Sequence, residues 1–175
     1  MFSQRDVACS RRYSGVALHS ICQAARSRRT AVCRSTDQLM LYDLHDKVLH
    51  YETTWHWQKA RAKLVAEGKE PQTLVLLQHR PVYTLGTYST VKNLKFDVES
   101  PPFPLFRTER GGEVTYHGPG QLVAYPIIDL RRHGQDLHEY LRKLEAVIIT
   151  ALREVSGISA FREEGLTGAM LAACP

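Results

Sequence analysis

The chain has 175 residues, of which 43% are hydrophobic and 23% charged, a composition typical of a soluble protein with enough length for one domain core. Its net charge of +5 is concentrated in residues 1–36, which carry +6 and leave −1 for the remainder. A nearly neutral body argues against a broad nucleic-acid-binding face. No stretch approaches the roughly 20 apolar residues of a membrane span.

Residues 1–36 contain seven arginines, six serines and a single acidic residue, Asp6. A segment rich in Arg and Ser and poor in acids is typical of an organelle transit peptide, and this one lacks the apolar centre of a secretory signal. We therefore expect a disordered targeting segment that is removed after import. A disordered basic tail and an arginine-rich RNA-binding arm are the alternatives.

The four cysteines have neither metal-type spacing nor the pattern of a disulfide framework. Three of them, Cys9, Cys22 and Cys33, lie in the expected targeting segment, and Cys174 lies at the other end of the sequence.

The expected folded body begins at Gln38 with a short strand over residues 38–44. A helix ending near Gly68 should follow, because apolar residues then recur at helical spacing. This apolar stripe consists of Leu44, Val48, Tyr51, Trp55, Ala62 and Val65. Residues two apart on a helix point in different directions, so we expect Trp55 in the core and Trp57 to be partly exposed.

A continuous apolar strand is predicted over residues 73–77, followed by a turn and a second strand over 82–85 that Gly86 stops. His79 lies between these strands, where a hydrogen-bonded structural histidine is favoured over a catalytic one. Residues 87–104 contain three prolines that disfavour a central strand, so they should form an irregular surface excursion.

Residues 110–126, with the sequence RGGEVTYHGPGQLVAYP, form the most informative stretch. Its glycines permit positive φ and close approach of a ligand to the backbone, and Pro119 fixes a turn. Alternation should place Glu113 and Thr115 on one side, opposite Val114 and Tyr116, and residues 122–128 should form a largely buried strand. A small-residue crevice with convergent Arg, Thr and His predicts a small-ligand site, although the spacing is that of neither a P-loop nor a dinucleotide fingerprint.

A second helix should begin after Asp136, which can form a capping-box-like pair with Glu139 and be followed at the other end by Gly157. One face of this helix is expected to be buried against the sheet. That face consists of Leu137, Tyr140, Leu141, Leu144, Val147, Ala151, Leu152 and Val155. Residues 158–161 could start a further strand.

The string at residues 110–126 closely resembles the signature of lipoyl(octanoyl) transferases, the LipB family, which are relatives of biotin and lipoate protein ligases. Residues 76–86, LLQHRPVYTLG, resemble the preceding strand and turn of that family, and residues 42–44 with Trp55 and Gln58 fit its first strand and helix. The resemblance runs from about residue 39 to Gly168 and is greatest to plastid-type members. It implies an α+β fold with a mixed sheet flanked by helices, like that of biotin/lipoate protein ligases and class II aminoacyl-tRNA synthetases, with the C-terminal part missing.

The resemblance also implies a reaction. An octanoyl group passes from acyl carrier protein to a cysteine, and then to a lysine on lipoyl domains of 2-oxoacid dehydrogenase complexes or the glycine cleavage H protein. The family needs no cofactor, metal or nucleotide, and neither nucleic acid nor a membrane is a partner. A monomer located in the plastid is expected, with the mitochondrion as the alternative.

Substrate binding is carried over from the family to eight consecutive residues: Arg110, Gly111, Gly112, Glu113, Val114, Thr115, Tyr116 and His117. The two leading glycines can let an acyl chain pass close to the backbone. Tyr116 and Val114 could form an apolar wall, with Thr115 and His117 as polar groups at its mouth. Arg110 is either a substrate contact or a structural clamp on a carboxylate.

We assign no catalytic residue in the sequence, because the family's cysteine, in a Pro-Cys-Gly turn, and its lysine lie beyond the segment that ends at Gly168. Residues 169–175 depart from the family pattern, and Cys174 lacks the flanking residues of the nucleophile. We therefore expect residues 37–168 to be the N-terminal part of the catalytic domain and 169–175 a divergent tail, in a fragment, a splice product or a mispredicted gene. A noncatalytic acyl- or carrier-binding module and a relative of the ATP-dependent lipoate ligases are the alternative functions.

Overall fold

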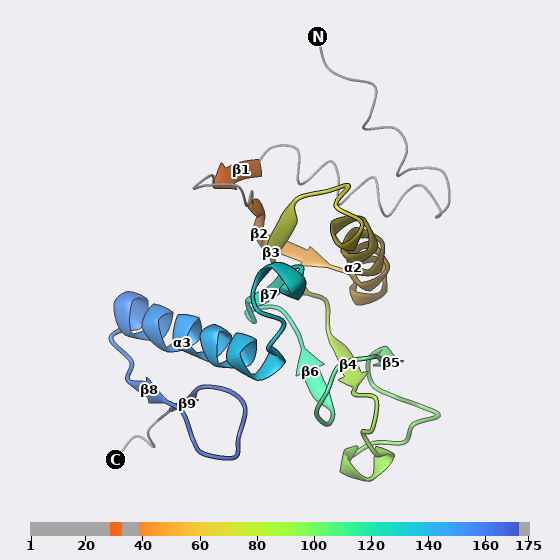
Figure 1. Cartoon of the computed structure of the whole chain (residues 1–175). Helices are drawn as coiled ribbons and strands as arrows, with labels where there is room; N and C mark the ends of the chain where they lie inside the picture. Colours follow the sequence, from red (N-terminus) through yellow and green to blue (C-terminus); the bar gives the residue numbers. More distant parts are fainter. Residues whose placement is uncertain (1–28, 33–38, 172–175) are drawn as a thin grey trace. The chain divides into compact units, whose positions relative to one another are not determined.

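A computed structural model describes residues 29–32 and 39–171. The chain divides into two compact units, residues 1–128 and residues 129–175, and each is described by itself. Figure 1 shows the elements of both units. The fold is α+β, with mixed sheets and two long helices, as the sequence predicted.

The main sheet of the first unit has the strand order β1-β2-β3-β7. Its strands are β1 (Arg29–Val32), β2 (Leu39–Leu49), β3 (Gln72–His79) and β7 (Val123–Ile127). The pairing of β2 with β3 is parallel, whereas β1 and β7 pair antiparallel with their neighbours. β1 lies within the segment expected to be disordered and upstream of Gln38, where the sequence placed the start of the body; the rest of the expected targeting segment lies outside the described residues.

Helix α2 (Tyr51–Ala66) forms the crossover between the parallel strands β2 and β3. It begins later than the apolar spacing predicted, because β2 continues through Val48 and Leu49, which pair with Gln78 and His79 after a register shift. The expectation that Leu44 and Val48 belong to the helix was therefore wrong. Pairing with a distant strand decided the boundary, and local periodicity does not reveal such pairing.

The core of the first unit lies between α2 and the main sheet. Its buried apolar residues are Tyr42, Leu44, Trp57, Val65, Val75, Leu77 and Ile127. Trp57 is only 8% exposed and packs edge-on against Tyr42, with ring centroids 5.6 Å apart. Trp55 is half-buried and lies beneath the ammonium group of Lys59, 3.9 Å from the ring centroid.

The expected roles of the two tryptophans are thus reversed. The buried face of α2 runs through Thr54, Trp57, Arg61 and Val65, which have helical spacing. Two of these residues are polar and do not count in an apolar stripe. Arg61 can be buried because its Nε donates to Thr73 Oγ1 at 3.0 Å and its Nη1 pairs with Glu70 Oε2 at 3.0 Å.

A second sheet in the first unit has the order β5-β4-β6. It consists of β4 (Val82–Leu85), β5 (Leu105–Arg107) and β6 (Thr115–His117) (Figure 1). β4 runs parallel to β5 and antiparallel to β6. Residues 87–104, which include the 3₁₀ turn η2 (Val91–Asn93), are largely exposed, which confirms the predicted surface excursion.

Strand β7 is less buried than the sequence predicted. Leu122, just before it, is 60% exposed, and Ile127 is its one buried residue. Among the described residues β7 pairs with β3 alone, and an edge strand is covered less than a central one. The largely buried strand expected over residues 122–128 is therefore incorrect.

The second unit contains η3 (Leu130–Arg132), helix α3 (Leu137–Ser156) and the antiparallel pair β8 (Ala160–Phe161) and β9 (Met170–Leu171). The predicted helix ends are confirmed. The Asp136 carboxylate accepts a hydrogen bond from Glu139 N at 3.0 Å, and Gly157 has a φ of 66°. Val147 is 64% exposed and Val155 is 85% exposed, so the second unit itself does not cover the apolar face of α3, and the packing of this face on the sheet stays a prediction.

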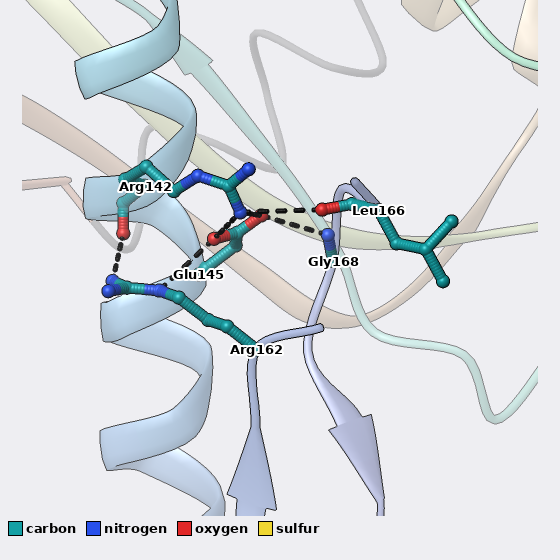
Figure 2. A network of polar contacts seen from close by, with 5 residues as sticks. All are labelled: Arg142, Glu145, Arg162, Leu166 and Gly168. Carbon is teal, nitrogen blue, oxygen red and sulfur yellow. Dashed lines mark hydrogen bonds and ion pairs between the residues drawn. The ribbon is translucent and has the colours of Figure 1, made fainter. Parts of the chain in front are cut away.

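The buried residue of α3 is Glu145, the centre of the polar network in Figure 2. Its carboxylate accepts from Arg142 Nη1 at 2.8 Å, from Arg162 Nε at 3.1 Å and from the backbone N–H of Gly168 at 2.9 Å. Arg142 Nη1 also donates to the Leu166 carbonyl at 3.3 Å. These contacts fix the loop between β8 and β9 to the helix.

This network predicts acid sensitivity of the loop. The Gly168 N–H, followed by Arg142, lowers the pKa of Glu145 below 4.5. A lowered folded-state pKa means that the carboxylate stabilises the loop fully above 4.5 and progressively less as the pH falls through the lowered value. Hydrogen exchange at the Gly168 amide, corrected for its intrinsic rate, should therefore accelerate in acid.

Glu145→Gln should remove that pH dependence. Glu139→Gln is the control, because Glu139 forms an exposed i,i+4 pair with Lys143 and should leave Gly168 exchange unchanged. Equal Gly168 protection in wild type and Glu145→Gln at neutral pH would contradict the network's role.

Candidate functional site

The loop at residues 110–113 packs closely against the end of β4. Thr87 N donates to the Arg110 carbonyl at 3.0 Å. A Cβ atom on Gly86 would lie 2.0 Å from the Gly112 carbonyl oxygen and 3.0 Å from that of Arg110. Only glycine fits at position 86. The sequence identified Gly86 as a strand stop but not as the residue that admits the loop.

Arg110 holds this loop in shape. Its Nε donates to Thr84 Oγ1 at 3.0 Å, and its Nη1 donates to the Gly111 carbonyl at 2.8 Å. Its Nη2 donates to the carbonyl oxygens of Thr84 and Glu113. Arg110 is therefore a structural clamp, although it holds carbonyl and hydroxyl oxygens and not the carboxylate that one of the two alternatives proposed.

The Glu113 carboxylate ties the loop to the neighbouring excursion. It accepts hydrogen bonds from Ser89 Oγ and from Asn93 Nδ2, each at 3.0 Å. These donors, Ser89 first, lower the pKa of Glu113. Arg107 Nη1 donates to the carbonyls of Gly86 at 3.0 Å and Ser89 at 3.1 Å, so two arginines and one carboxylate fix the loop and its surroundings.

The glycines of the loop leave its backbone accessible. Gly111 and Gly112 are exposed, and a Cβ on Gly111 would meet nothing within 4 Å. Gly112 has a φ of 76°, a conformation that favours glycine. The backbone of this loop is therefore exposed, and the approach of a ligand to it stays a prediction.

His117 lies on β6 next to the loop. Its Nδ1 is 2.7 Å from Gln121 Oε1, and its Nε2 is 3.4 Å from Thr84 Oγ1. Burial lowers the pKa of His117 and the charge of Arg110 lowers it further, while the hydrogen bond to Gln121 opposes both. His117 is consequently neutral at pH 7 and offers its nitrogens as one donor and one acceptor.

The register of β4 with β6 decides which side chains share a face. Val82 pairs with His117 and Thr84 pairs with Thr115, so these four residues lie on one face of the sheet. Tyr116 lies on the opposite face, where its ring is 5.2 Å from that of Tyr83 and 6.0 Å from that of Phe103. Tyr116 therefore does not form a wall beside Thr115 and His117. The alternation predicted from the sequence is confirmed for Thr115 and Tyr116.

The rings of Tyr51 and His79 lie beside the ring of His117. The Tyr51 ring is nearly parallel to the His117 ring, with centroids 6.2 Å apart, and the His79 ring is 6.0 Å away. His79 is fully buried, with Nδ1 3.2 Å from the Leu49 carbonyl and Nε2 2.7 Å from the Tyr125 hydroxyl. Burial lowers the pKa of His79 to about 4, so this histidine is neutral. The predicted hydrogen-bonded role of His79 is confirmed.

Removing the Tyr125 hydroxyl should destabilise the first unit. Tyr125→Phe leaves the buried Nε2 of His79 without its partner, which costs about 1 kcal/mol in the free energy of unfolding. Tyr88→Phe is the matched control, because Tyr88 is 93% exposed. Urea unfolding should show a lower midpoint for Tyr125→Phe alone, and identical midpoints would contradict the role given to this contact.

Hydrogen bonds also hold the glycine turn at residues 118–121, which follows His117. Gly120 N donates to Gln78 Oε1 at 2.7 Å, and Gln121 N donates to the Gly118 carbonyl at 3.2 Å. Gly120 has a φ of 91°. The turn thereby presents Gln121 to His117, a role that the sequence alone did not assign to this residue.

Within residues 29–32 and 39–171, no group of His, Cys, Asp and Glu side chains could hold a metal ion. In the same part of the chain, none of the helices combines the length and apolar character needed to cross a membrane.

Comparison with known proteins gives a consistent assignment. The family model described as Lipoyl protein ligase A/B catalytic domain matches residues 50–171. The chain is 51% identical over 132 residues to "Octanoyltransferase LIP2p2, chloroplastic" of Arabidopsis thaliana, which covers 73% of the chain and 47% of that protein.

Two bacterial relatives give a similar result. An octanoyltransferase of Synechococcus elongatus is 51% identical over 121 residues, with 69% of the chain and 52% of the relative covered. One from Prochlorococcus marinus is 46% identical over 143 residues, with 81% and 58% covered. The chain spans about half the length of the curated relatives it matches. It belongs to the lipoyl protein ligase A/B catalytic domain family, as the resemblance to the LipB family predicted.

Proposed function

We propose that the protein to which this chain belongs is an octanoyltransferase, and that the first unit supplies its acyl-binding part. The observation that carries this proposal is the loop at residues 110–113, whose glycine backbone is open while Arg110 holds its shape beside His117. The identity of about half of the aligned residues to octanoyltransferases supports the same function.

The loop suits an acyl thioester for physical reasons. Backbone without side chains lets an unbranched chain pass at van der Waals distance, and N–H groups in a fixed loop can stabilise the oxyanion of a tetrahedral intermediate. A neutral His117 can accept or donate one hydrogen bond at the carbonyl end without bringing a charge into an apolar site.

The proposed reaction has two transfers. A cysteine thiolate attacks the octanoyl carbonyl of acyl carrier protein and forms a thioester while the carrier's thiol leaves. A lysine amine of a lipoyl domain then attacks that thioester, forms an amide and releases the cysteine. The resemblance places the cysteine and its lysine beyond Gly168, and Cys174 lies outside the described residues, so we assign neither role to a described residue.

The proposed partners follow from this reaction. They are octanoyl-acyl carrier protein as donor, and lipoyl domains of 2-oxoacid dehydrogenase complexes and the glycine cleavage H protein as acceptors. We propose that the protein is a monomer in the plastid. The composition of residues 1–36 and the word "chloroplastic" in the name of the Arabidopsis relative support that location.

Binding of an acylated carrier tests the function of this chain. A carrier protein loaded with octanoyl through a non-transferable amide should bind the 175-residue chain at least about tenfold more tightly than the same carrier without an acyl group. A Gly111→Ala variant, which keeps the loop but puts a methyl group on its open backbone, should lose that preference. Equal affinity of wild type for both carriers would refute the acyl-binding role.

The family description also covers lipoate ligases, so an ATP-dependent ligase is the second candidate. The full-length protein should form no octanoyl-adenylate from octanoate and ATP, and should transfer octanoyl from the carrier without ATP. Adenylate formation would favour the ligase. Intact mass spectrometry of this chain after incubation with octanoyl carrier protein tests the noncatalytic binding module, which predicts binding without a covalent octanoyl adduct.

A further inference from the structure

Thr84 occupies the centre of the candidate site, although the resemblance assigns it no role. It lies on β4, is fully buried, and shares a face of the sheet with Thr115 and His117. Its hydroxyl lies between Arg110 and His117. Arg110 Nε is 3.0 Å from Thr84 Oγ1 on one side, and His117 Nε2 is 3.4 Å from it on the other.

The hydrogen-bond chemistry allows one direction for this chain of contacts. Arg110 Nε can only donate, so Thr84 Oγ1 accepts from it and is free to point its own proton elsewhere. On the far side of the imidazole, Gln121 Oε1 can only accept, so His117 Nδ1 must donate to it. A neutral imidazole with a proton on Nδ1 has a lone pair on Nε2, which faces the Thr84 hydroxyl.

The orientation of Gln121 is consistent with this assignment. Its Nε2 donates to the Tyr116 carbonyl at 3.5 Å, which leaves Oε1 directed at His117. The other groups beside the His117 ring are Tyr51 from α2 and His79 from β3. The His79 nitrogens already have partners in Leu49 and Tyr125, so the hydrogen bond of His117 to Gln121 sets its tautomer.

We infer that Thr84 is a positioning residue that links Arg110 to His117 by donating to Nε2 of the His117 tautomer that Gln121 sets. Through this link, the loop and the histidine are both held by the same side chain of β4. The effect on acyl binding rests on the function proposed above, whereas the tautomer of His117 does not depend on it.

Three variants of the 175-residue chain test this inference. Thr84→Val has nearly the same shape without the hydroxyl, and Thr84→Ser restores the hydroxyl. Thr73→Val is the matched control, because Thr73 is also fully buried and its hydroxyl accepts from Arg61 Nε at 3.0 Å, but it lies on β3 outside the site. A purely structural role of Thr84 predicts that Thr84→Val and Thr73→Val behave alike.

Two readouts separate the variants. Nitrogen NMR of labelled histidine should show the Nδ1-protonated tautomer of His117 in wild type, Thr84→Ser and Thr73→Val. Thr84→Val should keep this tautomer, which Gln121 sets, but should show a higher His117 pKa in a pH titration, because the neutral Nε2 has lost its donor. Octanoyl carrier protein should bind Thr84→Val about tenfold more weakly, and the other two variants within about threefold of wild type.

Unchanged acyl binding and an unchanged His117 pKa in Thr84→Val would overturn the inference. If Thr84→Val does not fold, the tautomer of the wild type still tests the inference. A proton on Nε2 of His117 would contradict a hydrogen bond donated by Thr84 to that nitrogen. Failure of wild type to bind the acylated carrier would instead refute the proposed function, and the tautomer would still test the position of Thr84.

Discussion

Replacing Gly86 with alanine is expected to displace the loop at residues 110–112 and to abolish the preference for an acylated carrier. The new Cβ would lie 2.0 Å from the Gly112 carbonyl oxygen and 3.1 Å from that of Gly111, and both are backbone atoms that no side-chain rotation can move. Overpacking of this kind costs about 3 kcal/mol in the free energy of unfolding. Urea unfolding and carrier titration measure the two effects.

Gly111→Ala is the matched comparison for Gly86→Ala. A Cβ on Gly111 would meet nothing within 4 Å, and its φ is not in the positive region, so the stability should change by less than about 0.5 kcal/mol. Acyl binding should nevertheless weaken, because the methyl group occupies the open backbone. If Gly86→Ala binds the octanoyl carrier as wild type does, the packing of this loop does not govern the site.

Arg110→Lys is expected to have the second-largest effect. Lysine keeps the positive charge but lacks the planar fork that donates at once to Thr84, Gly111 and Glu113. Loss of hydrogen bonds from a charged group to partly buried oxygens should cost about 2 kcal/mol of stability. Acyl binding should fall by more than about tenfold, because the loop is no longer held open.

Arg131→Lys serves as the control for this substitution. Arg131 pairs with Asp129 at 2.8 Å through a largely exposed guanidinium in the second unit, so an arginine-to-lysine change there should leave acyl binding unaltered and cost at most about 1 kcal/mol of stability. An Arg110→Lys protein with wild-type stability and weakened acyl binding would mean that Arg110 contacts the ligand and is not primarily a clamp.

Much of the fold could be predicted because its signals are local. Asp136 and Gly157 bound α3 as their capping chemistry predicts, and Gly86 ends β4. By contrast, the burial of Trp57 depends on Arg61 forming part of the same helical face, which requires partners on β3 and on the loop before it. The start of α2 was also misplaced, because the end of β2 is decided by its pairing with β3.

In the candidate site too, local features could be predicted from the sequence, whereas features that depend on a distant strand could not. Residue type alone indicated an open glycine loop with a neighbouring Arg and His. It did not indicate that Thr84 lies between Arg110 and His117, since this follows from the register of β4 with β6. Two residues of the sequence YTLG, Thr84 and Gly86, therefore shape the site without being in its recognised signature.

The most direct test of the acyl-binding role is to observe the backbone amides of the 175-residue chain by NMR during titration with amide-linked octanoyl carrier protein. The structure predicts saturable shifts concentrated at Gly111, Gly112 and His117, which the same carrier without an acyl group does not produce. Shifts confined to other residues, or identical shifts with both carriers, would contradict the proposal that this loop holds the octanoyl chain.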